Sequence, residues 1–141
     1  MAIYTSYFAN IKNLPNDTIT IAICGKVPEW YSGAQYKKLA PKWSFFKVWK
    51  ETKDNDYYIE HFQKEVLDKL DPAKIILELT KMAQNRTYAG IHTHNIALIC
   101  YEKPSDFCHR HLVANWINKW YKKCGLEDAE VKEWSKDGIN S

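Results

Sequence analysis

The segment Asn95–Tyr101, which reads Asn-Ile-Ala-Leu-Ile-Cys-Tyr, is an almost continuous apolar run. Such a run is typical of a strand that is buried on both faces, as in a parallel sheet covered on either side. Thr18–Cys24 alternates and is rich in β-branched residues, which predicts a second strand. Parallel strands must be joined by long crossovers, usually helices. These two segments therefore restrict the chain to an α/β fold.

Helical patterns fill most of the space between the two strands. Asp71 followed by Pro72 is a favoured N-cap and first helical residue, and a helix is expected to begin there. Ser105 or Asp106 is the expected cap of the last helix. The other expected helices cover Ala34–Ala40, Lys42–Glu51, Tyr57–Leu70 and Phe107–Lys123, and further strands cover Ala2–Ile11 and Ala129–Ser135.

Length and composition fit one folded domain. The chain has 141 residues, of which 45% are hydrophobic and 26% are charged, close to the average for globular proteins. No repeat or low-complexity linker divides it. The expected fold class is therefore α/β, as a single layered domain with a mostly parallel sheet flanked by helices. Its core spans about residues 2–135, and a short C-terminal tail follows.

Charge and hydropathy exclude several classes of partner. The net charge of +3 is spread along the chain, whereas a duplex-DNA binder concentrates positive charge on one face. The longest apolar run has six residues, far short of the roughly 20 that cross a bilayer. No secretory signal opens the chain, so we expect a cytoplasmic protein whose four cysteines are thiols.

One segment carries most of the chemistry, since it leaves a buried strand and enters a helix between Cys100 and Arg110. The free amides and dipole of a helix N-terminus favour an anion, and Arg110 could clamp a phosphate or carboxylate. The same field favours the thiolate form of Cys108. Glu102 could pair with Arg110, orient His109 or act as a base. Packing is the alternative role for each of these residues, above all for Cys100.

Aromatic and hydroxyl side chains are expected on the same edge of the sheet. Trp30 and Tyr36 follow the second strand and could flank a nucleobase, although both could equally belong to the core. Tyr7 and Ser6 end the first strand and could add hydroxyl contacts.

A metal is not expected, nor is any other cofactor. Cys100, Cys108 and His109, with His92 and His94, offer soft ligands near one strand. Their spacing differs from the knuckles of structural zinc sites. Adjacent helical residues also point about 100° apart, which would separate Cys108 from His109.

These motifs resemble the signature of domain-of-unknown-function family 488, the YeaO-like proteins of bacteria and phages. The resemblance covers most of residues 3 to 120 and implies a compact α/β fold with a shared pocket around the Cys-His-Arg turn. It implies no settled activity. His111, directly after Arg110, departs from the pattern. The matching segments are Tyr4–Phe8, Pro28-x-Trp30, Tyr36-x-x-Leu39-Ala40-Pro41, Cys100-x-Glu102 and Cys108-His109-Arg110.

The expected function is to bind a small phosphorylated or nucleotide-like ligand at the carboxyl ends of the strands. Hydrolysis or transfer by Glu102 or His109, or attack by the Cys108 thiolate, is left open, so the chain is not assigned as an enzyme. The alternatives are a phage protein that sequesters a nucleotide signal, or a module that binds protein or nucleic acid. A closed crevice at Arg110 would favour the module. Replacing Arg110 by alanine is expected to abolish binding and to leave stability nearly unchanged.

Overall fold

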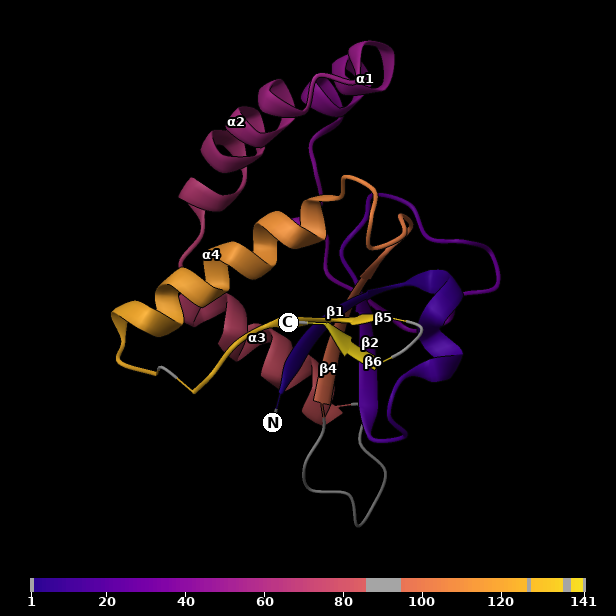
Figure 1. The fold of residues 1–141 in the computed structure, drawn as a ribbon, viewed down its shortest axis with the longest axis vertical. Coiled ribbons are helices and arrows are strands. Elements are labelled where there is room, and N and C mark those ends of the chain that lie inside the picture. Colours follow the sequence, from indigo (N-terminus) through magenta and orange to yellow (C-terminus); the bar gives the residue numbers. More distant parts are fainter. Residues whose placement is uncertain (1, 86–94, 127, 136–137, 141) are drawn as a thin grey trace.

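The computed structural model describes residues 2–85, 95–126, 128–135 and 138–140, and their strands form one sheet (Figure 1). The sheet order is β3-β2-β4-β1-β5-β6. The first five strands in this order are parallel, and β6 is antiparallel to β5. The predicted α/β class with a mostly parallel sheet is therefore confirmed. The strands are β1 (Ile3–Tyr7), β2 (Thr18–Ala22), β3 (Ala34–Gln35), β4 (Asn95–Cys100), β5 (Lys132–Ser135) and β6 (Gly138–Asn140).

Helices connect most of these strands. The predicted cap of α3 is confirmed, because the amide of Ala73 donates to Asp71 Oδ1 over 3.0 Å. The α-helices are α1 (Trp43–Thr52), α2 (Asn55–Glu65), α3 (Pro72–Asn85) and α4 (His109–Lys123). The 3₁₀ helices are η1 (Phe8–Asn13), η2 (Lys37–Leu39) and η3 (Leu67–Lys69). Of the described helices, none is long and apolar enough to cross a membrane.

Strand β4 is buried on both faces, as its apolar run predicts. Ile96 and Leu98 join the larger core, which also contains the inward residues of α3 and α4. Ala97 and Ile99 join a smaller core that includes Phe8 of η1 and residues of the loop after β2. The period of two places these side chains on alternate faces. One face is therefore covered by α-helices, and the other by a 3₁₀ helix and a loop.

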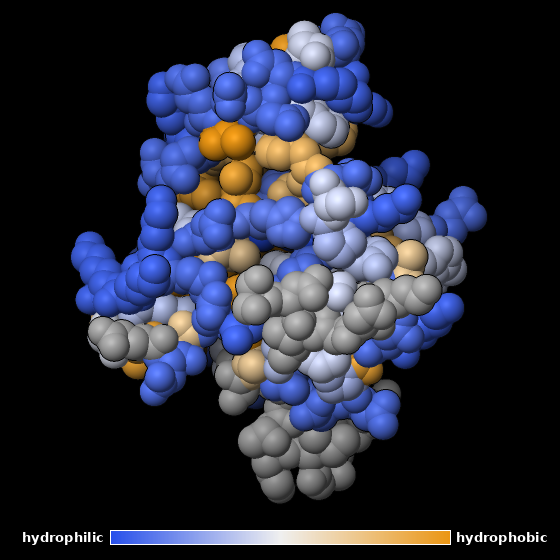
Figure 2. All heavy atoms as spheres, in the orientation of Figure 1, coloured by the Kyte–Doolittle hydropathy of each residue, from blue (hydrophilic) through white to orange (hydrophobic). Residues whose placement is uncertain are grey.

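Helices α1 and α2 stand beyond the carboxyl end of β4, at the top of Figure 1. Aromatic side chains hold them together, since the ring of Phe45 lies 5.3 Å from Tyr58 and 6.4 Å from Phe62. All three side chains are buried. An apolar groove separates α2 from α4, and orange side chains gather in the hollow below the upper helices in Figure 2. Its apolar lining consists of Ile59, Phe62, Leu67, Leu112 and Trp116.

Two secondary-structure predictions in the N-terminal half of the chain are wrong. Ala34–Ala40 was expected to be helical, but it forms β3 and η2, and the Tyr36 amide donates to the carbonyl of Ala22 over 2.8 Å. Pairing with the edge of β2 outweighs the local helical preference. The first strand was expected to reach Ile11, but it ends at Tyr7 and η1 follows.

The start of α4 also differs from the prediction. The helix begins at His109, and Cys108 is its N-cap, in an extended conformation with φ −152° and ψ 140°. Neither Ser105 nor Asp106 caps it. Cys108 therefore lies outside the first turn in which it was expected. Strand β6 lies in the segment that was expected to be a tail.

Candidate functional site

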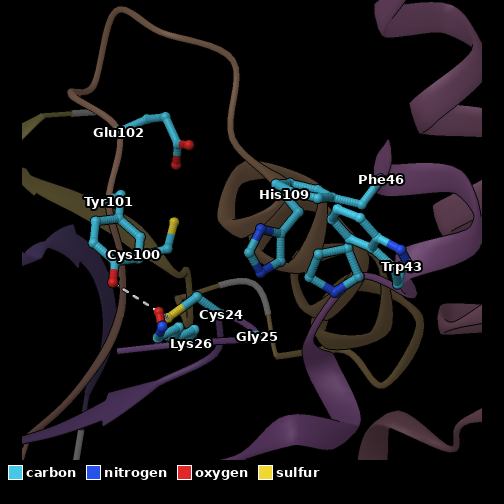
Figure 3. A pocket seen from close by; sticks show the side chains of 10 residues that line it. Cys24, Gly25, Lys26, Trp43, Phe46, Cys100, Tyr101, Glu102 and His109 are labelled. Carbon is cyan, nitrogen blue, oxygen red and sulfur yellow. Dashed lines mark hydrogen bonds between the residues drawn. The ribbon is translucent and has the colours of Figure 1, made fainter. Parts of the chain in front are cut away.

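A cavity of about 370 Å³ opens at the carboxyl ends of β2 and β4 (Figure 3). The loops after β2 and β4 line it. Helices α1 and α4 contribute the rest. The lining residues are Cys24, Gly25, Lys26, Pro41, Trp43, Phe46, Cys100, Tyr101, Glu102 and His109.

The sheet topology explains why the cavity lies here. From β2 the chain continues outward to β3, whereas from β4 it passes through α4 to β5 on the far side of β1. The connections of two neighbouring strands thus diverge. A crevice forms outside the carboxyl ends of the strands at such a switch point, and ligands of α/β proteins bind there.

Aromatic side chains form two sides of the cavity. Trp43 and Phe46 project from the first turn of α1, and 64% of the Trp43 surface is exposed. Opposite them, the Tyr101 hydroxyl donates to the carbonyl of Lys26 over 2.7 Å and ties the two loops together (Figure 3). Neither Trp43 nor Phe46 was among the residues predicted from the sequence. Their i, i+3 spacing after Pro41 predicts a shared face but not what that face meets.

Two charged side chains of opposite sign border this space. Glu102 is half-buried on the loop after β4, and Lys26 is exposed on the loop after β2. Within the described part of the chain, neither side chain forms an ion pair or a hydrogen bond. A carboxylate that accepts and an ammonium group that donates are therefore both available to a ligand.

Cys100 and Cys108 are joined as a disulfide, so the expectation that all four cysteines are thiols is wrong for this pair. The loop from β4 returns to the sheet and brings the strand end beside the helix cap, which linear spacing does not reveal. Cys24 and Cys124 are free. Cys24 lines the cavity, and burial raises the pKa of its thiol.

His109 is buried at the inner end of the cavity. Its Nε2 lies 2.6 Å from the carbonyl oxygen of Ile23, which can only accept, so Nε2 carries the proton. Nδ1 therefore has a free lone pair, and it faces Cys108 Sγ at 3.9 Å. Burial lowers the pKa of His109 to about 4, despite the hydrogen bond to Ile23. The imidazole is neutral at physiological pH.

Arg110 does not line the cavity. Its side chain is fully buried, and Nε and Nη2 donate to the Glu133 carboxylate over 3.0 and 2.8 Å. Nη1 donates to Cys100 Sγ over 3.3 Å. The expected partner was Glu102, but α4 packs over the sheet so that Arg110 reaches β5 instead. Every guanidinium nitrogen thus has a partner within the protein.

The remaining predicted site residues also lie outside the cavity. Trp30 is 64% exposed and packs edge-on against Phe8 at 6.0 Å. Tyr36 is buried and donates its hydroxyl to Glu78 of α3.

The two predicted residues at the end of β1 contact other parts of the protein. Ser6 Oγ donates to the carbonyl of Trp134 over 2.7 Å, and the Tyr7 ring lies 5.8 Å from the Arg110 guanidinium. The structure therefore brings together Cys100, Glu102, Cys108 and His109 but not the rest of the predicted set. His92 and His94 lie outside the described residues.

Residues 7–121 match the family model DUF488-N3a, described as the active DUF488-N3 subclade. The match includes β4, the loop with Glu102 and all of the Cys-His-Arg turn. No curated protein and no solved structure matches the chain.

Proposed function

The chain belongs to the active DUF488-N3 subclade, and from that premise we propose that it binds a small nucleotide-like molecule in the crevice between β2 and β4. The observation that carries the proposal is the cavity itself. Its volume of about 370 Å³ falls in the range of small-molecule sites, roughly 300–1,000 Å³. It has apolar walls and a few convergent polar groups, which is the usual composition of such sites.

The aromatic walls support a planar ligand. A nucleobase stacks favourably on indole and phenyl rings, and Trp43 offers such a face at the mouth of the cavity. The Glu102 carboxylate would accept from an exocyclic amino group of the base. The Lys26 ammonium group would neutralise a phosphate as a flexible point charge.

The ligand class and its location at the carboxyl ends of the strands are those expected from the sequence, but the residues proposed to contact the ligand differ. Trp43 and Phe46 take the place given to Trp30 and Tyr36, and Lys26 takes the place of Arg110. Arg110 is enclosed within the protein. A closed crevice at Arg110 was expected to favour a module that binds protein or nucleic acid. The open cavity beside His109 favours a small ligand instead.

Turnover would need a group that activates water or attacks the ligand. Glu102 is placed to act as a general base, because it borders the cavity without a partner in the described structure. Cys108 is 4% exposed and bonded to Cys100, so its sulfur does not face the ligand. If the ligand is released intact, the protein sequesters it in the cytoplasm, as expected of a phage protein that removes a nucleotide signal.

A thermal-shift screen tests this proposal. The panel contains the nucleoside mono-, di- and triphosphates, and the proteins are the wild type, Trp43→Ala and Trp30→Ala. A ligand at 100 times its Kd adds about 2.7 kcal/mol, or roughly 6 to 11 °C for a domain of this size. Both tryptophans are 64% exposed, so Trp30→Ala is the matched control.

We expect the shift to disappear in Trp43→Ala and to persist in Trp30→Ala. Chromatography of the mixture after denaturation then separates turnover from sequestration, because only an enzyme changes the nucleotide. The proposal fails if no nucleotide raises the melting temperature, or if both tryptophan variants lose the shift equally.

A further inference from the structure

We propose that, once the Cys100–Cys108 pair is reduced, Cys100 Sγ, Cys108 Sγ and His109 Nδ1 bind one thiophilic divalent metal ion of the zinc class. The three atoms come from the end of β4 and the start of α4. The inference does not depend on the nucleotide proposal, because it concerns side chains of this chain and an ion alone.

Distances between the three atoms support a common ion. All of them lie within 4.8 Å of one another, and Cys108 Sγ is 3.9 Å from His109 Nδ1. Tetrahedral zinc with Zn–S bonds of about 2.3 Å and Zn–N bonds of about 2.0 Å places neighbouring ligand atoms roughly 3.5–3.8 Å apart. Small side-chain movements would therefore bring all three into coordination.

The hydrogen bond of His109 to Ile23 is the second observation. A histidine that ligates a metal almost always donates its other ring nitrogen to a carbonyl or carboxylate, which fixes the tautomer and the ring. His109 Nε2 does this over 2.6 Å. The free lone pair on Nδ1 is thereby directed at the two sulfur atoms.

The backbone conformation of Cys108 allows its side chain and that of His109 to reach the same ion, although the two residues are adjacent in sequence. Adjacent residues on a helix diverge, but Cys108 is an extended N-cap and only His109 is helical. Their side chains can therefore converge. The Cα atoms of Cys100 and Cys108 are 7.7 Å apart, wider than the roughly 4.4–6.8 Å usual for disulfides. This spacing leaves room for an ion between the sulfur atoms after reduction.

The local charges also balance around such an ion. Two thiolates and one divalent cation sum to zero, and Arg110 and Glu133 form a neutral pair beside them. Arg110 Nη1 donates to Cys100 Sγ over 3.3 Å, which would stabilise a bound thiolate. Binding therefore leaves no uncompensated charge in this buried region.

The fourth coordination position would face the cavity. Cys100 and His109 both line it, and the Cys100 sulfur points into the space between Tyr101, Glu102 and His109 (Figure 3). Three protein ligands with one open position are the pattern of catalytic rather than structural zinc. A molecule in the cavity would thus meet the ion directly.

Metal binding to reduced protein tests this inference without any nucleotide. The protein is reduced with a phosphine, freed of reductant without air, and titrated with Zn²⁺ and separately with Co²⁺. We expect one ion per chain, release of the two thiol protons, and thiolate-to-cobalt charge-transfer absorption in the near ultraviolet. Cys100→Ser and Cys108→Ser should each abolish that absorption.

Two cysteine variants serve as controls. Cys124→Ser removes an exposed free thiol, and Cys24→Ser removes a free thiol that lines the same cavity. Both should bind one ion with the charge-transfer band intact. His109→Gln keeps both thiols, and we expect its metal affinity to fall at least about tenfold, since loss of outer-shell partners alone costs about 10–100-fold.

Circular dichroism establishes that each variant is folded before titration. Absence of bound metal in reduced, folded wild-type protein would overturn the inference. So would a charge-transfer band that survives Cys108→Ser, a metal affinity that is unchanged in His109→Gln, or a band that disappears in Cys124→Ser.

Discussion

At the residue scale, a single guanidinium joins three parts of the molecule. Arg110 lies in the first turn of α4, Glu133 belongs to β5, and Cys100 ends β4. Thr5 of β1 also donates to Glu133, from Oγ1 to Oε1 over 2.6 Å. The Arg110 side chain is fully buried and that of Glu133 is 11% exposed, so water does little to screen the pair.

Removal of Arg110 should therefore destabilise the fold, contrary to the expectation from sequence. We predict that Arg110→Ala lowers the free energy of unfolding by about 3–5 kcal/mol, because it leaves the Glu133 carboxylate buried without its cation. Urea unfolding at pH 7 measures the difference. The exposed pair Lys38–Glu78 provides a contrast, and Lys38→Ala should leave the unfolding midpoint almost unchanged.

A double variant distinguishes loss of the ion pair from loss of packing. Arg110→Met with Glu133→Gln removes both charges but keeps similar volume and an acceptor for Thr5. It should recover most of the stability lost in Arg110→Ala. A single variant that costs less than about 1 kcal/mol would contradict the account of a desolvated pair.

At the scale of elements, α3, β2 and β4 could be predicted correctly because their signals are local in the sequence. Such signals need no tertiary information. Asp71 before Pro72 fixes the start of α3, and β4 is apolar on both faces because both faces are covered. Residues 34–40 differ, since their structure depends on the edge of β2, which a local pattern cannot include. The cap at Cys108 likewise depends on where β4 ends.

The hydrogen bond by which Asp71 caps α3 leads to a prediction about stability. Asp71→Ala should lower the free energy of unfolding by about 1 kcal/mol, because the Ala73 amide loses its acceptor. Asp71→Asn retains an oxygen at the same place and should cost little. Urea unfolding of the two variants against the wild type measures both values. Equal losses in the two variants would show that the side-chain oxygen does not cap the helix.

At the scale of the whole molecule, the place of the site could be predicted but its walls could not. The α/β class implies a crevice at the strand carboxyl ends, and the cavity lies there. Trp43 reaches it only because α1 and α2 stand above that edge, held by Phe45, Tyr58 and Phe62. Arg110 turns away because β5 lies beside β1. Both facts depend on packing between distant segments.

The central claim is that a nucleotide-like ligand binds beside Trp43, and the six tryptophan indoles allow a direct measurement. In ¹⁵N-labelled protein each indole N–H gives one NMR signal, assigned with single Trp→Phe variants. The probe is a titration with the four ribonucleoside monophosphates. The account predicts that at least one of them moves the Trp43 signal in a saturable way and leaves the Trp30 signal unchanged. A Trp43 signal that stays fixed with all four, or a saturable change confined to Trp30, would contradict it.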